Sequence, residues 1–354
     1  MRVQRLFAWG AAALLLAVAA SVAVFALLRS FNHFEPVETA FAGSCSPVIG
    51  VAGPEDLQID PATRLAFVSS LDRRAGDGEG ERGSVLAFSL DDPLAETAWR
   101  DRTDGVPARF EPLGLHFWSD GTTRRLFVVN AAADAVELYD VGEDGALAHL
   151  GSFSERRLTS PNDVVGVGPR AFYVSNDAEA GRDSLLGRLQ FVLRQGAGKI
   201  MHYDGASWRV SAEGLKFANG LAVDRAGTRL YAAETAASAL SVYARDPATG
   251  AISLLRREAM PAAIDNLNID PDGALWIAGH PKPLLLPAYA RDPEGRAPSI
   301  VLRYDASENG GAATRVYADD GAELSASTAA SRLGSTLLIG ALLERKFLIC
   351  DLAS

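Results

Sequence analysis

The chain has 354 residues, of which 48% are hydrophobic, so it is long and apolar enough to bury a large core. Its net charge is −10, and because the first thirty residues carry +3, the rest of the chain carries −13. A surface this acidic repels a phosphate backbone, which argues against nucleic-acid binding.

The first predicted element is an apolar helix over residues 6–28, a run without a charged side chain. About 20 apolar residues are enough for a helix to cross a bilayer, whereas the apolar region of a signal peptide is usually shorter. Ala17 and Ala19 could mark a cleavage site, but the apolar run continues beyond them. We therefore predict that residues 1–30 form an uncleaved membrane anchor, with a cleaved signal as the alternative.

The charges that flank this run give a slight preference for one orientation. Arg2 and Arg5 precede the apolar residues and Arg29 follows them, which favours a cytoplasmic N-terminus and an extracytoplasmic main domain. We expect a linker over residues 31–44 and one folded domain over residues 45–354.

The two cysteines lie near the ends of that expected domain, at Cys45 and Cys350. They could be two buried free thiols. In an exported domain, a disulfide that joins the first and last strands is the favoured interpretation.

A strand–turn–strand unit recurs six times along the domain. Each copy has a small or polar start, a short alternating strand, a turn and a second apolar strand, and further strand-like runs lie between the copies. The copies begin at residues 55, 113, 162, 219, 265 and 327. Four strands in about fifty residues make one blade of a β-propeller. We therefore predict an all-β fold, a six-bladed β-propeller whose ring is closed by strands from both ends of the chain.

One segment, residues 181–195, breaks the repeat. Leu185, Leu189 and Val192 recur there at helical spacing, which predicts a short amphipathic helix that caps one face of the propeller.

Residues 265–281 contain a pattern that resembles the start of an EF-hand calcium loop, with Asn268, Asp270, Asp272 and Gly273 in place. An EF-hand needs a glutamate at the twelfth position, and that position is Gly279. The apolar residues on both sides alternate with period two, so we interpret this segment as a turn between two strands.

In four copies, one or both of the first two residues carry a carboxylate or amide side chain. Equivalent positions in successive blades lie around the central channel, so these side chains should converge there and offer the oxygen ligands that Ca²⁺ prefers. The alternative is that Asp and Asn start these strands only because they suit turns. The residues are Glu55, Asp56, Asn162, Asp163, Asn219, Asp265 and Asn266.

At these positions the chain resembles the paraoxonase (arylesterase/lactonase) family. The motifs "GPEDLQI", "FANGLAVD", "DNLNIDP" and "GSTLLIG", in this order and with the early and terminal cysteines, carry the resemblance over nearly the whole chain. The resemblance implies a six-bladed propeller with two calcium ions in its channel and activity on lactones and aryl esters. It implies a catalytic calcium ion held by Glu55, Asn162, Asn219, Asp265 and Asn266. It also implies a structural calcium ion held by Asp56, Asp163 and the backbone carbonyl of Leu115.

The chain departs from the family at two histidine positions. Members of the family typically carry a histidine dyad that is proposed to activate water, and this chain has Leu113 and Ala131 at those positions. His116 lies three residues beyond Leu113, so strand alternation should point it the other way, as a packed residue. His280 matches a family histidine and is expected near the mouth of the pocket.

The sequence therefore predicts a calcium-dependent hydrolase of lactones, anchored in a membrane, with a small lactone or ester as substrate. The catalytic candidates are Asp265 and Glu55, either of which could activate water or attack directly, together with His280. Two alternatives stay open, a gluconolactonase-like hydrolase of sugar lactones and a non-catalytic propeller that binds a ligand.

Overall fold

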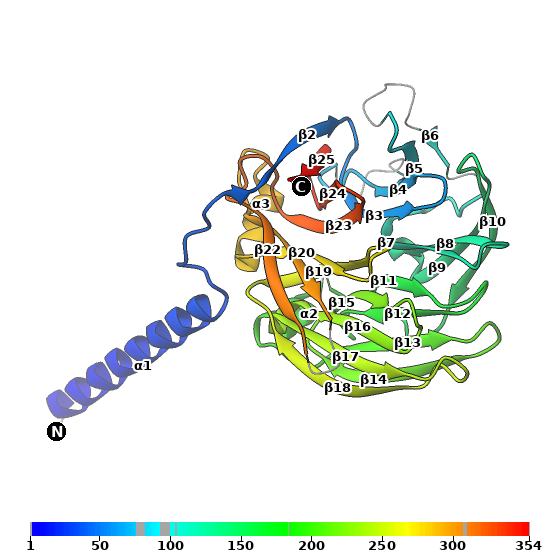
Figure 1. Cartoon of the computed structure of the whole chain (residues 1–354). Coiled ribbons are helices and arrows are strands. Elements are labelled where there is room, and N and C mark those ends of the chain that lie inside the picture. Colours follow the sequence, from blue (N-terminus) through cyan, green and yellow to red (C-terminus); the bar gives the residue numbers. More distant parts are fainter. Residues whose placement is uncertain are drawn as a thin grey trace.

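The computed structural model describes residues 2–75, 82–92, 100–102, 105–182, 184–306 and 310–353. In these residues the strands form six antiparallel sheets, and the first strand of each sheet contacts the first strand of the next until the ring is closed. Figure 1 shows these sheets arranged around a common axis. The prediction of an all-β, six-bladed propeller is confirmed.

The innermost strands begin within two residues of the predicted repeat starts. They are β3 (Pro54–Asp60), β7 (Pro112–Ser119), β11 (Pro161–Gly166), β15 (Ala218–Val223), β19 (Ala263–Ile269) and β23 (Ser327–Leu333). The second strands are β4 (Leu65–Ser70), β8 (Arg124–Asn130), β12 (Phe172–Asn176), β16 (Arg229–Glu234), β20 (Leu275–His280) and β24 (Thr336–Ala341).

The outer strands complete each blade. The third strands are β5 (Ser84–Ser89), β9 (Ala135–Val141), β13 (Gly198–Tyr203), β17 (Ala239–Arg245), β21 (Ser299–Asp305) and β25 (Lys346–Leu352). The fourth strands are β6 (Arg100–Asp101), β10 (Leu147–Ser154), β14 (Trp208–Leu215), β18 (Ile252–Ala259), β22 (Ala312–Asp319) and, from the N-terminal side, β2 (Gly43–Ile49).

Burial changes from the axis outward. Every residue of β11, β12 and β20 is buried, because sheets pack on both faces of these strands. In the outermost strand β10 the residues alternate between more and less exposed, as expected for a strand with one face toward solvent. The apolar core therefore lies between neighbouring blades.

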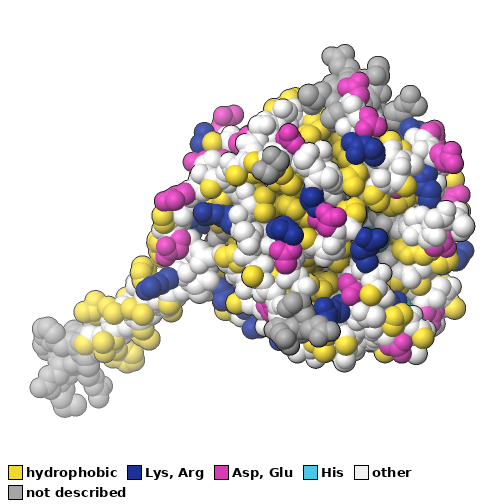
Figure 2. Space-filling model, viewed as in Figure 1, with side chains coloured by type: hydrophobic (Ala, Val, Ile, Leu, Met, Phe, Trp, Pro, Cys, Tyr) yellow, Lys and Arg dark blue, Asp and Glu magenta, His cyan; other side chains and the backbone are white. Residues whose placement is uncertain are grey.

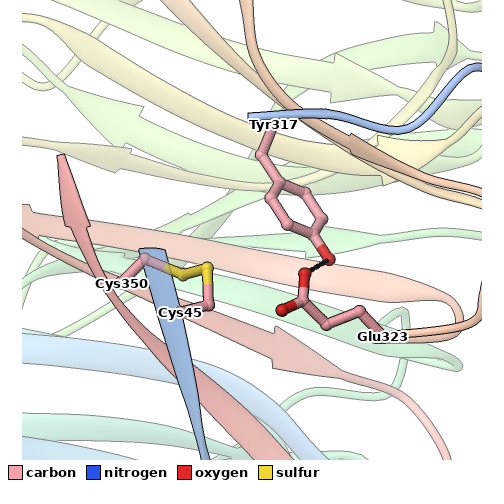
Figure 3. Close-up of a disulfide and its surroundings, with 4 residues drawn as sticks. All are labelled: Cys45, Tyr317, Glu323 and Cys350. Carbon is pink, nitrogen blue, oxygen red and sulfur yellow. Dashed lines mark hydrogen bonds between the residues drawn. A yellow bond between two sulfur atoms is a disulfide. The ribbon is translucent and has the colours of Figure 1, made fainter. Parts of the chain in front are cut away.

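The ring closes through β2, which pairs in register with β25 and thereby completes the last blade. Cys45 lies directly opposite Cys350 in this pairing, and the two form a disulfide across 305 residues of sequence (Figure 3). Val48, Phe88 and Phe347 belong to one apolar cluster that joins the last blade to the first. The predicted disulfide between terminal strands is confirmed.

The N-terminal helix α1 (Arg2–Ser30) projects away from the propeller, and its described surface is almost entirely hydrophobic (Figures 1 and 2). By length and composition, Ala11–Ser30 could cross a membrane, and no residue in the most apolar part of this described span is buried against the protein. After the helix, Phe31 is buried against the ring of Phe191, and β1 (Ala40–Phe41) pairs with β22. The segment expected to be a linker thus contacts the propeller at two places.

A short helix, α2 (Leu185–Val192), occurs where the leucine spacing predicts one. Its leucines do not make the contacts with the propeller, however. Leu185 is 77% exposed and Leu189 is 47% exposed, whereas Phe191 packs against Phe31 and Phe217. Another helix, α3 (Leu286–Arg291), and the 3-10 turns η1 (Ala131–Ala133), η2 (Thr235–Ala237) and η3 (Pro283–Leu285) lie in loops between strands.

The segment that resembles an EF-hand is a turn between β19 and β20, as predicted. Asp270 Oδ1 accepts hydrogen bonds from the backbone N–H groups of Asp272 and Ala274, both at 2.9 Å. Its other oxygen accepts from Trp276 Nε1 at 2.9 Å and from Arg332 at 2.8 Å. All of these contacts hold the turn, and none prepares a cation site.

We expect the double substitution Cys45→Ser/Cys350→Ser to lower the free energy of unfolding by about 2–4 kcal/mol, because the bridge restricts the unfolded chain. Equilibrium denaturation in urea measures this loss. The nearby Tyr317→Phe substitution is the control, since it removes only the 3.0 Å hydrogen bond to Glu323 (Figure 3) and should cost about 1 kcal/mol. Equal losses in the two variants would contradict a special role of the bridge in ring closure.

Candidate metal centre

Each of the six inner strands has a β-bulge at the same place. The register with the neighbouring strand shifts between Pro54 and Leu57 in β3, and it shifts at the equivalent positions of the other inner strands. A bulge frees residues from regular pairing and re-aims their side chains. The freed pairs are residues 55–56, 113–114, 162–163, 219–220, 265–266 and 328–329. The predicted metal-binding side chains all lie in these bulges.

The structure brings the first group of predicted ligands together in hydrogen-bonded pairs, two of which join different blades. Asn219 Nδ2 donates to Asp265 Oδ1 at 2.5 Å, and Asn266 Nδ2 donates to Glu55 Oε1 at 3.1 Å. Asn162 Nδ2 donates to Asp177 Oδ2 at 3.1 Å, and all of these side chains are buried. The amide nitrogens are therefore used against carboxylates, which leaves the amide oxygens available.

Four buried oxygens of this group have no hydrogen-bond partner. They are Glu55 Oε2, Asn162 Oδ1, Asn219 Oδ1 and Asn266 Oδ1. Leaving a buried polar atom unpaired costs about 1–3 kcal/mol, so four such acceptors from four blades need an explanation. A hard cation that prefers oxygen ligands provides one, and the donor set fits Ca²⁺. Among the described residues, no group of three or more His, Cys, Asp or Glu side chains is arranged to hold a metal ion. A cation site here would therefore need the amide oxygens as ligands as well.

The second group, Asp56 and Asp163, shows the same contacts in two different blades. Asp56 Oδ2 accepts from the N–H of Leu115 at 2.8 Å, and Asp163 Oδ2 accepts from the N–H of Leu221 at 2.6 Å. Each carboxylate also accepts from the N–H of the residue that follows it. Leu115 thus contacts Asp56 through its N–H, and ligation by its carbonyl stays a prediction.

Glycine is required where Asp163 meets the neighbouring blade. A Cβ atom on Gly114 would lie 2.2 Å from Asp163 Oδ1. The close approach of the two inner strands therefore depends on the absence of a side chain at Gly114.

The carboxyl groups in the channel are held under electrostatic strain. Burial raises the pKa of Glu55 to about 7, an effect that Arg73 opposes and Asp265 reinforces. Burial and the charge of Glu55 raise the pKa of Asp56 well above its usual value, and burial and Asp56 do the same for Asp163. Bound divalent cations would relieve this repulsion, because opposite charge favours the ionised carboxylates.

His280 lies beside the predicted ligand Asp265. Its Nε2 is 2.7 Å from Asp265 Oδ2, and its Nδ1 is buried without a partner. The other two positions where the family would carry histidine hold no proton-transferring group. Leu113 is buried in an apolar cluster, and Ala131 begins η1 next to that cluster.

His116 lies away from the polar cluster of predicted ligands and lines a cavity at the opposite ends of the inner strands. Its Nδ1 accepts from the N–H of Gly166 at 3.2 Å, and burial lowers the pKa of His116 to about 4. The cavity has a volume of about 350 Å³ and is also lined by Gln58, Asn268 and Arg332. It lies away from Glu55 and Asp265, so we base the functional argument on the polar cluster at the strand starts.

Three polar residues at the site were not expected from the sequence. Thr328 Oγ1 donates to the carbonyl of Glu55 at 2.7 Å, and Thr328 occupies the second position of the sixth repeat, where alignment of the copies could have revealed it. Arg73 and Arg182 lie in loops outside the repeats, so no periodic signal indicates them. Arg182 forms an ion pair with Asp177 at 3.1 Å, and Asp177 in turn contacts Asn162.

Comparison with known proteins agrees with this arrangement. A family model described as arylesterase matches residues 82–352. Human serum paraoxonase/arylesterase 1 is 32% identical over 337 residues, covering 92% of each chain. Among solved structures, a luciferin-regenerating enzyme superposes with a TM-score of 0.57 at 12% identity, covering 87% of this chain and 95% of its own. A gluconolactonase from Xanthomonas campestris superposes with a TM-score of 0.54 at 18% identity, covering 90% and 99%.

The two solved structures establish only a shared propeller fold, since their sequences are distant. The family match over residues 82–352 and the 32% identity to the human relative are stronger evidence, because they establish membership of a family. The chain therefore belongs to the arylesterase family of hydrolases, together with the serum paraoxonases/arylesterases.

Proposed function

We propose that the chain is a calcium-dependent hydrolase of lactones and aryl esters, held at a membrane by α1 with the propeller on the extracytoplasmic side. The observation that carries the proposal is the set of four unpaired, buried oxygens from Glu55, Asn162, Asn219 and Asn266. Family membership supports ester or lactone hydrolysis as the reaction.

Two groups of residues would hold two calcium ions. The unpaired oxygens and Asp265 would hold one ion, and Asp56 and Asp163 would hold the other. When bound at the first position, calcium would supply a positive charge that polarises the ester carbonyl and stabilises the oxyanion.

The chain's own residues supply the groups that can accept a proton from water. Asp265 is oriented by Asn219 on one oxygen and by His280 on the other. Glu55 is oriented by Asn266 on one oxygen only. Because Leu113 and Ala131 cannot transfer protons, these carboxylates and His280 are the remaining candidates for base or nucleophile.

A hydrolysis screen with the full chain in detergent tests the proposal. The substrates are simple lactones, sugar lactones and aryl acetates, each assayed with calcium and with excess chelator. Calcium-dependent turnover of lactones and aryl esters supports the proposal, and turnover of sugar lactones alone would favour the gluconolactonase-like alternative. Absence of any turnover by calcium-loaded protein would favour a non-catalytic, ligand-binding propeller.

We expect calcium to raise the melting temperature, and to raise it more at pH 7.5 than at pH 5. The pKa of Glu55 in the metal-free protein is raised from 4.5 to about 7. Its contribution to stability is therefore present below pH 4.5 and is lost as the pH rises to about 7. Calcium offsets that loss, so the difference between loaded and chelated protein should grow across this window. A melting temperature that does not respond to chelator at either pH, with no metal found by elemental analysis, contradicts the site.

The two groups of ligands should respond differently to substitution. Asp56→Asn and Asp163→Asn should lower the melting temperature, because these side chains tie together the inner strands of adjacent blades through Leu115 and Leu221. Asn219→Ala and Asn266→Ala should reduce turnover more than stability. Calorimetry and initial rates at saturating calcium separate the two effects.

Asp265→Asn should reduce kcat by about 100-fold or more, since the carboxylate is both a proposed ligand and a candidate base. His280→Gln should have a smaller effect, because it removes one hydrogen bond to Asp265. His116→Gln is the control, since this histidine lies at the other end of the channel. If His116→Gln abolished turnover while calcium binding was unchanged, the assignment of the base would be wrong.

We expect the full chain to stay in the membrane fraction after alkaline carbonate extraction, because residues 11–30 form an exposed apolar helix long enough to span a bilayer. N-terminal sequencing of the mature protein gives the decisive measurement. A mature N-terminus near Ala20 and a soluble protein would show that the segment is a cleaved signal.

A further inference from the structure

Arg73 is partly exposed and is fixed close to Glu55 by backbone carbonyls of two blades. Its Nη1 donates to the carbonyl of Gly53 at 2.8 Å, and its Nη2 donates to the carbonyl of Pro112 at 2.6 Å. Gly53 precedes Glu55 by two residues, and Pro112 directly precedes Leu113. The guanidinium is thus held between the first proposed ligand and the position where a family histidine is replaced by leucine.

The charge of Arg73 is not neutralised by a direct ion pair. Among the residues described, no carboxylate lies within 4.0 Å of its guanidinium, and its electrostatic partners at longer range are Glu55 and Glu111, which attract it, and Arg182, which repels it. Arg182, in contrast, has Asp177 at 3.1 Å. If a divalent cation balances Glu55, the longer-range attraction of Glu111 is what remains to offset the charge of Arg73 among these partners, and none of them forms a direct ion pair with it.

The absence of a direct ion pair favours an anion from outside the protein as a direct partner of Arg73. A guanidinium presents several N–H donors in a planar fork, and carboxylates bind to such a fork with two hydrogen bonds. Arg73 cannot act as a base, because arginine stays protonated at all working pH values. The neighbouring Leu113 is apolar and buried, so the charge of Arg73 is the polar feature at this position.

We propose that Arg73, with Arg182 beside it, binds a carboxylate on the substrate, so that the enzyme selects lactones and esters that carry a negative charge near the hydrolysed carbonyl. This specificity rests on the proposed hydrolase function. The competing explanation is purely structural: Arg73 would only tie the two blades together through Gly53 and Pro112.

Two lactones of nearly equal shape test the proposal. γ-Carboxy-γ-butyrolactone and γ-valerolactone differ by a carboxylate in place of a methyl group. We expect the calcium-loaded full chain to prefer the charged lactone. Arg73→Met should reduce kcat/KM for the charged lactone by about 10- to 100-fold, mainly through KM, and change the value for γ-valerolactone by less than about threefold. Arg73→Lys, which keeps the charge but not the fork, should fall between the two.

Arg124→Met is the matched control. Arg124 also joins two blades, through Asp60 at 2.5 Å, and it donates to the carbonyl of Gly142 in its own blade at 2.8 Å, but at the opposite ends of the inner strands. The Arg124→Met substitution removes the same charge and a comparable contact between blades. It should therefore lower the melting temperature without changing the ratio of kcat/KM for the two lactones. A wild-type enzyme with no preference for the charged lactone, or an Arg73→Met variant with an unchanged ratio, overturns the proposal. An equal loss on both lactones in Arg73→Met also overturns it.

A binding measurement separates failure of this proposal from failure of the proposed function. Hydroxyglutarate, the hydrolysis product of the charged lactone, should raise the melting temperature of the wild-type chain and of Arg124→Met but not of Arg73→Met. If neither lactone is hydrolysed and this pattern is seen, the anion site stands and the hydrolase function fails. If lactones are hydrolysed and hydroxyglutarate has no effect on the wild type, the anion site fails alone. If the Arg73→Met variant does not fold, the ratio of kcat/KM for the two lactones in Arg73→Lys and Arg182→Met tests the proposal instead.

Discussion

The structure depends on the burial of like-charged carboxyl groups along one axis. Glu55, Asp56, Asp163 and Asp265 are all at most 6% exposed, and each of them lies in a bulge of an inner strand. Desolvation and mutual repulsion would oppose folding if nothing balanced them. The protein meets part of this cost with backbone N–H groups, which reach Asp56 and Asp163 from neighbouring blades. Under the proposed function, a cation bound by the unpaired oxygens would offset the remaining part.

The bulges explain how two adjacent residues can face the same channel. In a regular strand, neighbouring side chains point to opposite faces, so only one of Glu55 and Asp56 could face the axis. The register shift in all six inner strands removes this restriction at one height of the propeller. The arrangement requires close contact between blades, and glycine at position 114 permits it. Ring closure by β2 and the disulfide then fixes the sixth blade against the first.

Much of the fold was predictable because its signal is periodic. The six repeats indicate the blades, and the paired oxygen-bearing residues at their starts indicate the polar cluster. Features that depend on contacts between repeats were not predictable. The bulges, the contact of His280 with Asp265 and the use of the asparagine nitrogens against carboxylates appear only in three dimensions. The exposed leucines of α2 show that helical spacing can identify a helix without identifying the face that packs, since Phe191 makes the contact instead.

Under the proposed function, the arrangement of hydrogen bonds suits Glu55 and Asp265 to different tasks. Both oxygens of Asp265 are engaged, one by Asn219 and the other by His280, so its orientation is fixed in two directions. Glu55 has one oxygen engaged and one unpaired. The unpaired oxygen suits Glu55 to ligation, where a free lone pair is needed. The contact with His280 suits Asp265 to proton transfer, because an imidazole beside the carboxylate can share the proton that it accepts. Acid–base chemistry would then rely on the pair of Asp265 and His280, since neither Leu113 nor Ala131 can transfer a proton.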